Sequence, residues 1–299
     1  MPSSFKAPTH AHTTITALIV AQIEAGAPDF VMPWHVPRSL GRPANALTAK
    51  SYRGINVVAL WAEGLKHGYG SGVWATYRQW SEVGAQVRTG SHGTPIVFYK
   101  PAPSRTAGPA SDDESDAPTK RRLILRTSIV FNQDQVEGWS PPDDPSPSCI
   151  APHERADAVV HQTGARVIHG GHVAAYDRTH DRILMPEPTA FQGTPSSTPT
   201  EAYYATLLHE LVHWTGGPLR LDRPFGQFGD EAYAFEELIA ELGAAFLCAD
   251  LGVTNVPRAD HAAYIATWLK ALKHDARALF RAAALADQAA MVILDPRQT

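Results

Sequence analysis

The chain has 299 residues, which is more than one ordinary domain of about 100–200 residues and too few for three. With 44% hydrophobic and 19% charged residues it can bury a substantial core, so we expect a folded, soluble protein. The net charge of −4 is unevenly spread: residues 1–110 hold ten Lys and Arg against four Asp and Glu, and the remainder hold sixteen against twenty-six. A basic half joined to an acidic half predicts two tasks, with a polyanion as the partner of the first half.

Targeting and redox signals are also informative. No stretch approaches 18 consecutive apolar residues, which argues against a membrane-spanning helix and against a membrane as partner. Residues 1–14 hold no apolar run, so no signal peptide is predicted. The two cysteines, Cys149 and Cys248, form no CxxC motif, which fits a reducing compartment. We therefore expect a cytoplasmic protein.

The first half predicts three helices and two strands. Helical periodicity indicates helices over residues 14–25, 56–67 and 76–83, with Asn56 as N-cap of the second. Runs rich in Ile, Val and Phe indicate strands over residues 95–100 and 123–131. Residues 101–120 between them are rich in Pro, Ala, Ser and Asp, so we expect a flexible loop there.

The second half predicts a small sheet followed by four helices. The proline-rich residues 141–152 indicate a linker between a domain of residues 1–140 and a domain of residues 153–299. Strand patterns over residues 165–168, 173–176 and 182–185 predict a small β-meander with a turn at residues 177–181. Helical patterns follow over residues 201–216, 231–251, 261–273 and 276–290. The expected fold class is α+β, with an α/β first domain and a mainly helical second domain.

The helix over residues 201–216 carries the pattern His-Glu-X-X-His. His209 and His213 are four residues apart, so both imidazoles project from one helix face. That spacing lets two neutral nitrogens reach one metal at about 2.0–2.1 Å. Glu210 could take a proton from metal-bound water, whose pKa a metal lowers toward about 7. Burying these three side chains without a metal would be costly, although two histidines on a solvated helix face are the alternative interpretation.

The next helix supplies carboxylates. Glu237 and Glu241 are four apart and share a face with small apolar residues, which predicts that they point inward. We predict Glu237 as third metal ligand and Glu241 as the residue that holds a histidine ring. Glu236 lies about 100° around the helix and is interpreted as a solvated surface charge. The alternative is that Glu237 and Glu241 form surface ion pairs.

Residues 30–100 combine positive charge with aromatic residues, the combination that binds unpaired nucleic acid. Basic side chains track phosphates, and aromatic faces stack on bases at about 1–3 kcal/mol each. Trp61, Trp74 and Trp80 lie at apolar positions and are interpreted as core residues. The predicted surface contacts are Lys50, Tyr52, Arg53, Arg78, Arg88 and His92. No base-reading chemistry is recognisable, which favours weak sequence preference.

These motifs resemble a known family, the plasmid-borne ArdC antirestriction proteins. The second half carries YYATLLHELVHWTGG and YAFEELIAELGAAFL, and the first half carries NALTAKSYRGINVVALW, WATYRQW, VRTGSHGTPIVFYK and SIVFNQDQVEGW. A related domain occurs in some plasmid conjugation primases. The resemblance implies an N-terminal domain that binds single-stranded DNA, a zincin-like C-terminal domain and protection of incoming plasmid DNA from restriction. The acidic stretch over residues 101–120 departs from the family as an insertion without a motif.

Three hypotheses remain open at this point. The first is an antirestriction protein that binds single-stranded DNA and holds Zn²⁺, with Mn²⁺ as another option, at a metalloprotease-type site. The second is a metallopeptidase whose basic half only positions a protein substrate, such as a component of the host restriction system. The third is a DNA-shielding protein whose metal is not catalytic.

Overall fold

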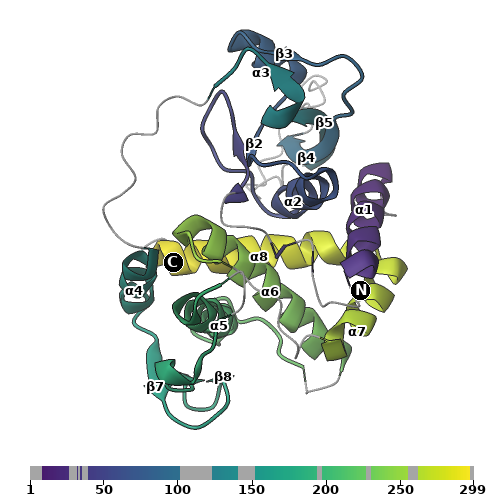
Figure 1. Cartoon of the computed structure of the whole chain (residues 1–299). Coiled ribbons are helices and arrows are strands. Elements are labelled where there is room, and N and C mark those ends of the chain that lie inside the picture. Colours follow the sequence, from purple (N-terminus) through teal and green to yellow (C-terminus); the bar gives the residue numbers. More distant parts are fainter. Residues whose placement is uncertain are drawn as a thin grey trace, which may run out of the picture.

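The computed structural model describes residues 9–26, 32, 34–35, 40–101, 123–140, 152–193, 197–226, 230–254 and 262–296. The fold is mixed α+β: an N-terminal part with a curled sheet lies against a largely helical C-terminal part with its own small sheet (Figure 1). The predicted fold class is confirmed. The predicted linker and the predicted loop over residues 101–120 fall almost entirely outside the described residues.

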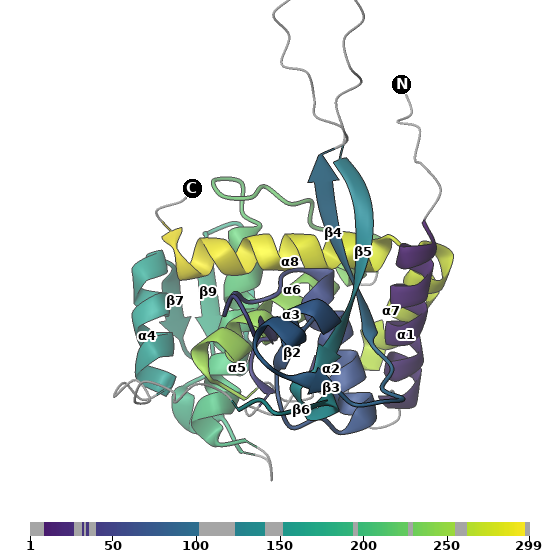
Figure 2. The same ribbon diagram turned by 90° about the horizontal axis from the view of Figure 1, so that it is seen from above.

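The N-terminal part combines helices α1 to α3 with two sheets. The helices are α1 (His10–Gly26), α2 (Ile55–His67) and α3 (Tyr77–Glu82), with a 3-10 helix, η3, at Gln133–Gln135. The strands are β1 (Ala44–Asn45), β2 (Val73–Ala75), β3 (Gln86–Val87), β4 (Thr94–Pro101), β5 (Leu123–Asn132) and β6 (Val136–Glu137). Four strands pair in the order β1-β2-β5-β4, and β3 pairs with β6. Figure 2 shows β4 and β5 as a long, twisted two-stranded arm.

Helix α2 differs from its prediction at its first turn. Gly54, with φ of 55°, occupies the N-cap position, so the prediction of Asn56 as N-cap is wrong. The Asn56 side chain instead donates to Val97 O at 2.7 Å and accepts from Val97 N at 2.8 Å. One amide side chain thereby attaches α2 to the backbone of β4, where it satisfies both polar groups of Val97.

The C-terminal part consists of helices with a three-stranded sheet at one edge (Figure 1). Its helices are α4 (Pro152–Thr163), α5 (Pro199–Thr215), α6 (Glu231–Leu251), α7 (Ala262–His274) and α8 (Ala278–Leu294), with the 3-10 helix η4 at Pro188–Ala190. Its strands are β7 (Arg166–His169), β8 (Ala175–Asp177) and β9 (Arg182–Met185). The sheet order is β7-β9-β8, and β7 runs parallel to β9. The prediction of a meander is therefore wrong in its connectivity, although its three strands are present.

The two parts share one hydrophobic core. Helix α8 lies between α2 on one side and α5 and α6 on the other, and α1 lies beside α7 (Figures 1 and 2). The Thr16 hydroxyl on α1 donates to Ala276 O, just before α8, at 2.7 Å. Arg42 is half-buried between Asp250 on α6 and Asp287 on α8 and pairs with both. Within the described residues, no helix is long and apolar enough to cross a membrane.

Candidate metal centre

Helix α5 begins and ends where its sequence directs. Thr198 and Glu201 form a capping box, in which the Thr198 hydroxyl accepts from Glu201 N and the Glu201 carboxylate accepts from Thr198 N. Pro199 fits the first turn because its missing N–H would have no helical partner there. The segment from Leu207 to Thr215 is buried throughout. The histidines of α5 therefore face the protein interior.

Helix α6 packs closely against α5. Asp230 caps its N-terminus, and Gly252 ends it in the left-handed conformation, with φ of 72°. A Cβ atom placed on Gly243 would lie 2.7 Å from a methyl carbon of Val212 on α5. Only a residue without a side chain fits at this crossing, which brings the carboxylates of α6 within reach of the histidines of α5.

Three side chains converge between these two helices. Nε2 of His209 and Nε2 of His213 are 3.2 Å apart. The two carboxylate oxygens of Glu237 lie 3.6 Å from His209 Nε2 and 3.5 Å from His213 Nε2. A tetrahedral ion with bonds of about 2.0–2.1 Å holds two nitrogens about 3.3 Å apart. The three groups therefore fit a divalent metal, with their ligand atoms within 4.8 Å of one another.

The other ring nitrogens point away from that centre, each toward a glutamate of α6. Nδ1 of His209 lies 3.0 Å from Oε1 of Glu241, the carboxylate that was predicted from the sequence to hold a histidine ring. Nδ1 of His213 lies 3.2 Å from Glu236. A carboxylate at Nδ1 keeps the proton on that nitrogen and leaves Nε2 free to bind a metal. Both histidines are therefore oriented in the way that metal ligands require.

The interpretation of Glu236 as a solvated surface charge is wrong. Glu236 is buried, and besides His213 it accepts two hydrogen bonds from the guanidinium of Arg223, at 2.9 and 2.7 Å. Arg223 is itself buried and is fixed by Thr215 and Val212. The physical reason is that α6 is apolar on nearly all sides, so a rotation of 100° does not reach solvent. That all-round apolar pattern was the signal in the sequence that could have identified Glu236.

The charge balance of the centre favours a bound cation. Four buried carboxylates act on the two histidines: those of Glu236, Glu237 and Glu241 lie against the imidazoles, and that of Glu210 acts on His213 through its charge. Arg223 offsets one of them. Buried uncompensated charge is costly, and a divalent ion at the convergence point would offset it.

Protonation in the metal-free protein follows from the same contacts. Burial by itself would lower the pKa of His213, but hydrogen bonds with Glu236 and Glu237 outweigh it and raise that pKa to about 10. Burial opposes the shift of Glu237 too, yet hydrogen bonds from His209 and His213 lower its pKa. Without a metal, the positive charge of a protonated His213 thus partly compensates the negative charge of the surrounding carboxylates.

Known proteins match both halves of the chain. Residues 9–131 match the family of the N-terminal domain of anti-restriction factor ArdC, and residues 154–285 match the zincin-like metallopeptidase family. The metal-free crystal structure of ArdC from plasmid R388 is 37% identical, covers 95% of this chain and 97% of its own, and superposes with a TM-score of 0.74. The chain belongs to the ArdC antirestriction family.

Other relatives of this ArdC-family protein extend the comparison. The Mn(II)-bound structure of ArdC from R388 is 38% identical with the same coverage and a TM-score of 0.72. The protein y4eC of Sinorhizobium fredii is 43% identical over 285 residues, which are 95% of this chain and 91% of y4eC. The DNA primase TraC of Escherichia coli is 38% identical over 292 residues, but the chain spans only 26% of that primase.

The predicted DNA contacts in the ArdC N-terminal domain lie at three places. Lys50, Tyr52 and Arg53 precede α2, Arg78 lies on α3, and Arg88 and His92 lie between β3 and β4. Tyr52 is half-buried, and its hydroxyl donates to Trp74 O and accepts from Asn45, which makes it a packing residue. Arg53 pairs with Asp287 of α8 at 2.9 Å. Trp61, Trp74 and Trp80 are buried, as predicted.

The remaining predicted contacts are exposed to solvent. Lys50, Arg78, Arg88 and His92 are all at the surface. Arg78 has 90% of its side chain exposed and pairs only with Glu82 of its own helix among the described residues, at 2.9 Å. Arg88 lies 3.6 Å from Glu137 and donates to Val136 O. These surface positions remain candidates for phosphate contacts.

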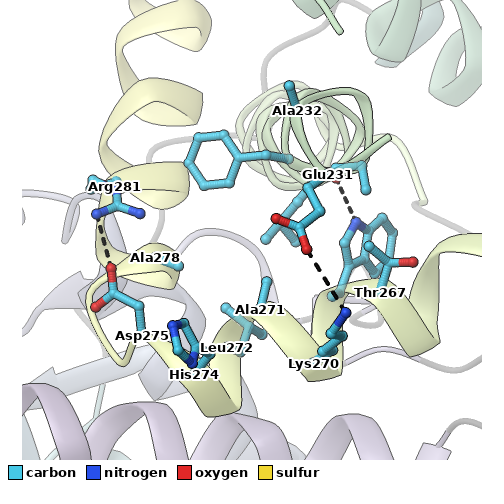
Figure 3. Close-up of a pocket in the computed structure, with 14 residues that line it drawn as sticks. Glu231, Ala232, Thr267, Lys270, Ala271, Leu272, His274, Asp275, Ala278 and Arg281 are labelled. Carbon is cyan, nitrogen blue, oxygen red and sulfur yellow. Dashed lines mark hydrogen bonds and ion pairs between the residues drawn. The ribbon is translucent and has the colours of Figure 1, made fainter. Parts of the chain in front are cut away.

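A cavity of about 690 Å³ lies at the N-terminal end of α6, between that helix, α7 and α8 (Figure 3). Phe235, Leu238 and Trp268 line its apolar part, and Trp268 Nε1 donates to Ala234 O at 2.7 Å. Its charged lining residues pair with one another, as in the contact between Asp275 and Arg281. None of the metal-centre residues lines it, so the cavity is separate from the metal site of this ArdC-family protein.

Proposed function

We propose that this protein is a single-stranded-DNA-binding antirestriction protein whose metal centre performs metal-dependent hydrolysis of the peptidase type. The observation that carries the proposal is the convergence of His209, His213 and Glu237. Glu210 is buried on α5, the helix that carries the two histidines. Three protein ligands leave one coordination position open, which is the arrangement of catalytic rather than structural zinc sites.

The proposed metal is zinc. Two imidazole nitrogens and one carboxylate are a common ligand set of catalytic zinc. Mn²⁺ is the second candidate because the related ArdC of plasmid R388 crystallised with Mn(II). A bound divalent ion would supply Lewis acidity and lower the pKa of water at its open position.

The chain's own residues would then share the remaining tasks. Glu236 and Glu241 hold the imidazoles of His213 and His209 in the orientation that presents Nε2. Glu210, which follows His209 directly in α5, would accept a proton from the attacking water and deliver it to the leaving group. Burial of these groups strengthens their electrostatic interactions with a reacting carbonyl.

The DNA-binding part of the proposal is supported by charge and exposure. Basic side chains at Lys50, Arg78 and Arg88 are exposed on the N-terminal part, and residues 1–110 carry excess positive charge. Tyr77 and Tyr99 are each more than half exposed and could stack on unpaired bases.

Metal content tests the centre itself. Purified protein should contain about one zinc or manganese ion per chain by elemental analysis. The His209→Ala, His213→Ala double variant should lose it, and added metal should no longer raise the melting temperature, because a ligand that binds the folded state stabilises by mass action. Stoichiometric metal in the double variant would show that the ion binds elsewhere.

DNA binding should be measured on the full chain. We expect single-stranded DNA to bind more tightly than duplex, with an affinity that falls as salt rises, because phosphate contacts release counterions. Equal affinity for both forms, or no binding at low salt, contradicts this part of the proposal.

One comparison separates hydrolysis from shielding. Glu210→Gln keeps the shape of the side chain and should retain metal and DNA binding, while hydrolysis falls by about 10²–10⁴-fold. The Lys50→Ala, Arg78→Ala, Arg88→Ala triple variant should weaken DNA binding and leave the metal in place. Arg53 is left unchanged because it pairs with Asp287.

Protection of plasmid DNA from restriction is then scored for both variants. We expect protection to fail in the triple variant, since the proposed function requires DNA binding. Protection that survives in Glu210→Gln would assign the antirestriction effect to shielding. Protection that is lost in Glu210→Gln but kept in the triple variant would favour hydrolysis of a host protein, with the restriction system as the target.

A further inference from the structure

A third histidine lies behind the metal centre, and it comes from the N-terminal part of the chain. His35 is buried, with 2% of its side chain exposed. Its Nε2 atom lies 3.8 Å from Glu241 Oε2, on α6. The other oxygen of the same carboxylate, Oε1, lies 3.0 Å from Nδ1 of His209. Glu241 therefore stands between a proposed metal ligand and a residue more than 170 positions earlier in the sequence.

The backbone selects the tautomer of the His35 ring. Met32 N donates a hydrogen bond to His35 Nδ1 at 3.0 Å. A nitrogen that accepts a hydrogen bond carries no proton, so the proton of the neutral ring is on Nε2. The N–H group that faces Glu241 is thus a donor, and within the described residues it forms no hydrogen bond. At 3.8 Å it makes a charge–dipole contact with the carboxylate.

The second histidine of the centre, His213, has a similar arrangement of a glutamate and a further side chain behind it. There, Glu236 holds His213, and Arg223 holds Glu236. A buried carboxylate orients a ligand only if its own position is fixed and its charge is compensated. Arg223 supplies this for Glu236 through two hydrogen bonds. His35 is in the equivalent place for Glu241, where its neutral ring offers an N–H dipole instead of a positive charge.

We propose that His35 is a positioning residue of the metal centre: it orients and stabilises the Glu241 carboxylate, which in turn holds His209. The inference rests on the metal site named under the proposed function and not on hydrolysis or DNA binding. It means that the affinity of the site for metal depends on the N-terminal part of the chain.

Metal affinity of the full chain tests this inference. His35→Leu removes the N–H donor and should lower the affinity for Zn²⁺ by about tenfold, the lower end of the range for residues that support a metal ligand. The affinity is measured by competition with a chromogenic chelator. His35→Gln can place an amide N–H near the same point and should recover most of the affinity. Mn²⁺ titrated by calorimetry should give the same ranking.

A matched control separates positioning from packing. Trp34 is the adjacent residue, is also fully buried, and packs against Trp268. Trp34→Phe should lower the melting temperature of the metal-free protein and leave Zn²⁺ affinity unchanged. If Trp34→Phe lowers the affinity as much as His35→Leu does, the effect is general loosening and the proposal is wrong.

A double-mutant cycle with Glu241 gives the decisive result. In a Glu241→Gln background, His35→Leu should cause no further loss of Zn²⁺ affinity, because the residue through which it acts has changed. Additive losses in the double variant would overturn the proposal, as would wild-type affinity of His35→Leu. Neither of these outcomes bears on whether the centre hydrolyses peptides, because zinc binding is measured without substrate.

Discussion

Glu236, Glu237 and Glu241 have the same side chain within six residues of one helix, and each has a different neighbour. Glu237 faces the two Nε2 atoms, whereas Glu236 and Glu241 face the Nδ1 atoms of His213 and His209. The helical geometry of α6 assigns these neighbours, because positions one and four residues away from Glu237 flank it around the helix. The chemistry of the centre is thus set by register on α6 and not by residue type.

The raised pKa of His213 predicts that the stability of the metal-free protein depends on pH in a way that the stability of the metal-bound protein does not. A histidine whose pKa rises from about 6.5 to about 10 on folding stabilises the fold fully below about pH 6.5, and this contribution is lost as pH rises through about 10. The melting temperature in EDTA should therefore fall between pH 7 and 9.5. With zinc bound His213 carries no such proton, so the gain in melting temperature on adding zinc should grow over the same window.

The Glu236→Gln variant is the control for this prediction. It removes one of the charges that raise the pKa of His213, so the decline in EDTA should become shallower. A parallel decline with and without zinc would contradict the assignment to His213.

At the scale of elements, the crossing of α5 and α6 places the ligands. Gly243 on α6 faces Val212 on α5, the residue next to His213. A side chain there must push the helices apart, and the separation between Glu237 and the histidines would grow with it. Gly243 therefore helps to position the metal ligands, although it does not contact them.

Gly243→Ala should reduce both stability and metal affinity. Overpacking of this kind typically costs about 1–3 kcal/mol. We expect a lower denaturation midpoint and a weaker Zn²⁺ affinity than in the wild type. Gly64→Ala on α2 is a suitable control, since a Cβ atom there meets nothing within 4 Å. Unchanged zinc affinity in Gly243→Ala would show that the ligand geometry tolerates the displacement.

Elements with strong local signals are those that the sequence predicts well. The capping box at Thr198, the Asp230 cap and the apolar periodicity locate α5 and α6 within two residues. Helix α4 was not predicted from the sequence. Ala156 is the one residue of this helix that the structure shows as buried, so its sequence has little of the apolar periodicity that marks a helix. The parallel pairing of β7 with β9 and the role of Asn56 depend on partners distant in sequence, which local patterns do not encode.

At the scale of the whole molecule, one hydrophobic core extends across the predicted boundary between the two domains. Ile15, Ile19 and Trp34 of the N-terminal part belong to the same buried cluster as Leu238 and Phe246 of α6. Arg42 connects the parts through ion pairs with Asp250 and Asp287 that are largely shielded from solvent. The parts are distinct in topology but interdependent in packing.

Separation of the two parts should therefore destabilise both. Residues 1–140 and 153–299 expressed alone would each expose large aliphatic side chains, whose burial contributes about 1.5–3 kcal/mol each. We expect poor solubility or low melting temperatures for each fragment, recovery on co-expression, and one cooperative thermal transition for the intact chain. A fragment of residues 1–140 that unfolds cooperatively at the melting temperature of the intact protein would show that it is an independent domain.

The shared core also determines when the protein can complete its fold during synthesis. The ribosome delivers α1 and α2 long before α7 and α8, the helices against which they pack. The nascent chain must therefore carry the apolar faces of its first helices through most of translation, a surface of the kind that chaperones protect. His35 is likewise synthesised 206 residues before Glu241, the residue that it faces in the folded protein. Metal uptake is thus a late event in the life of each newly made molecule.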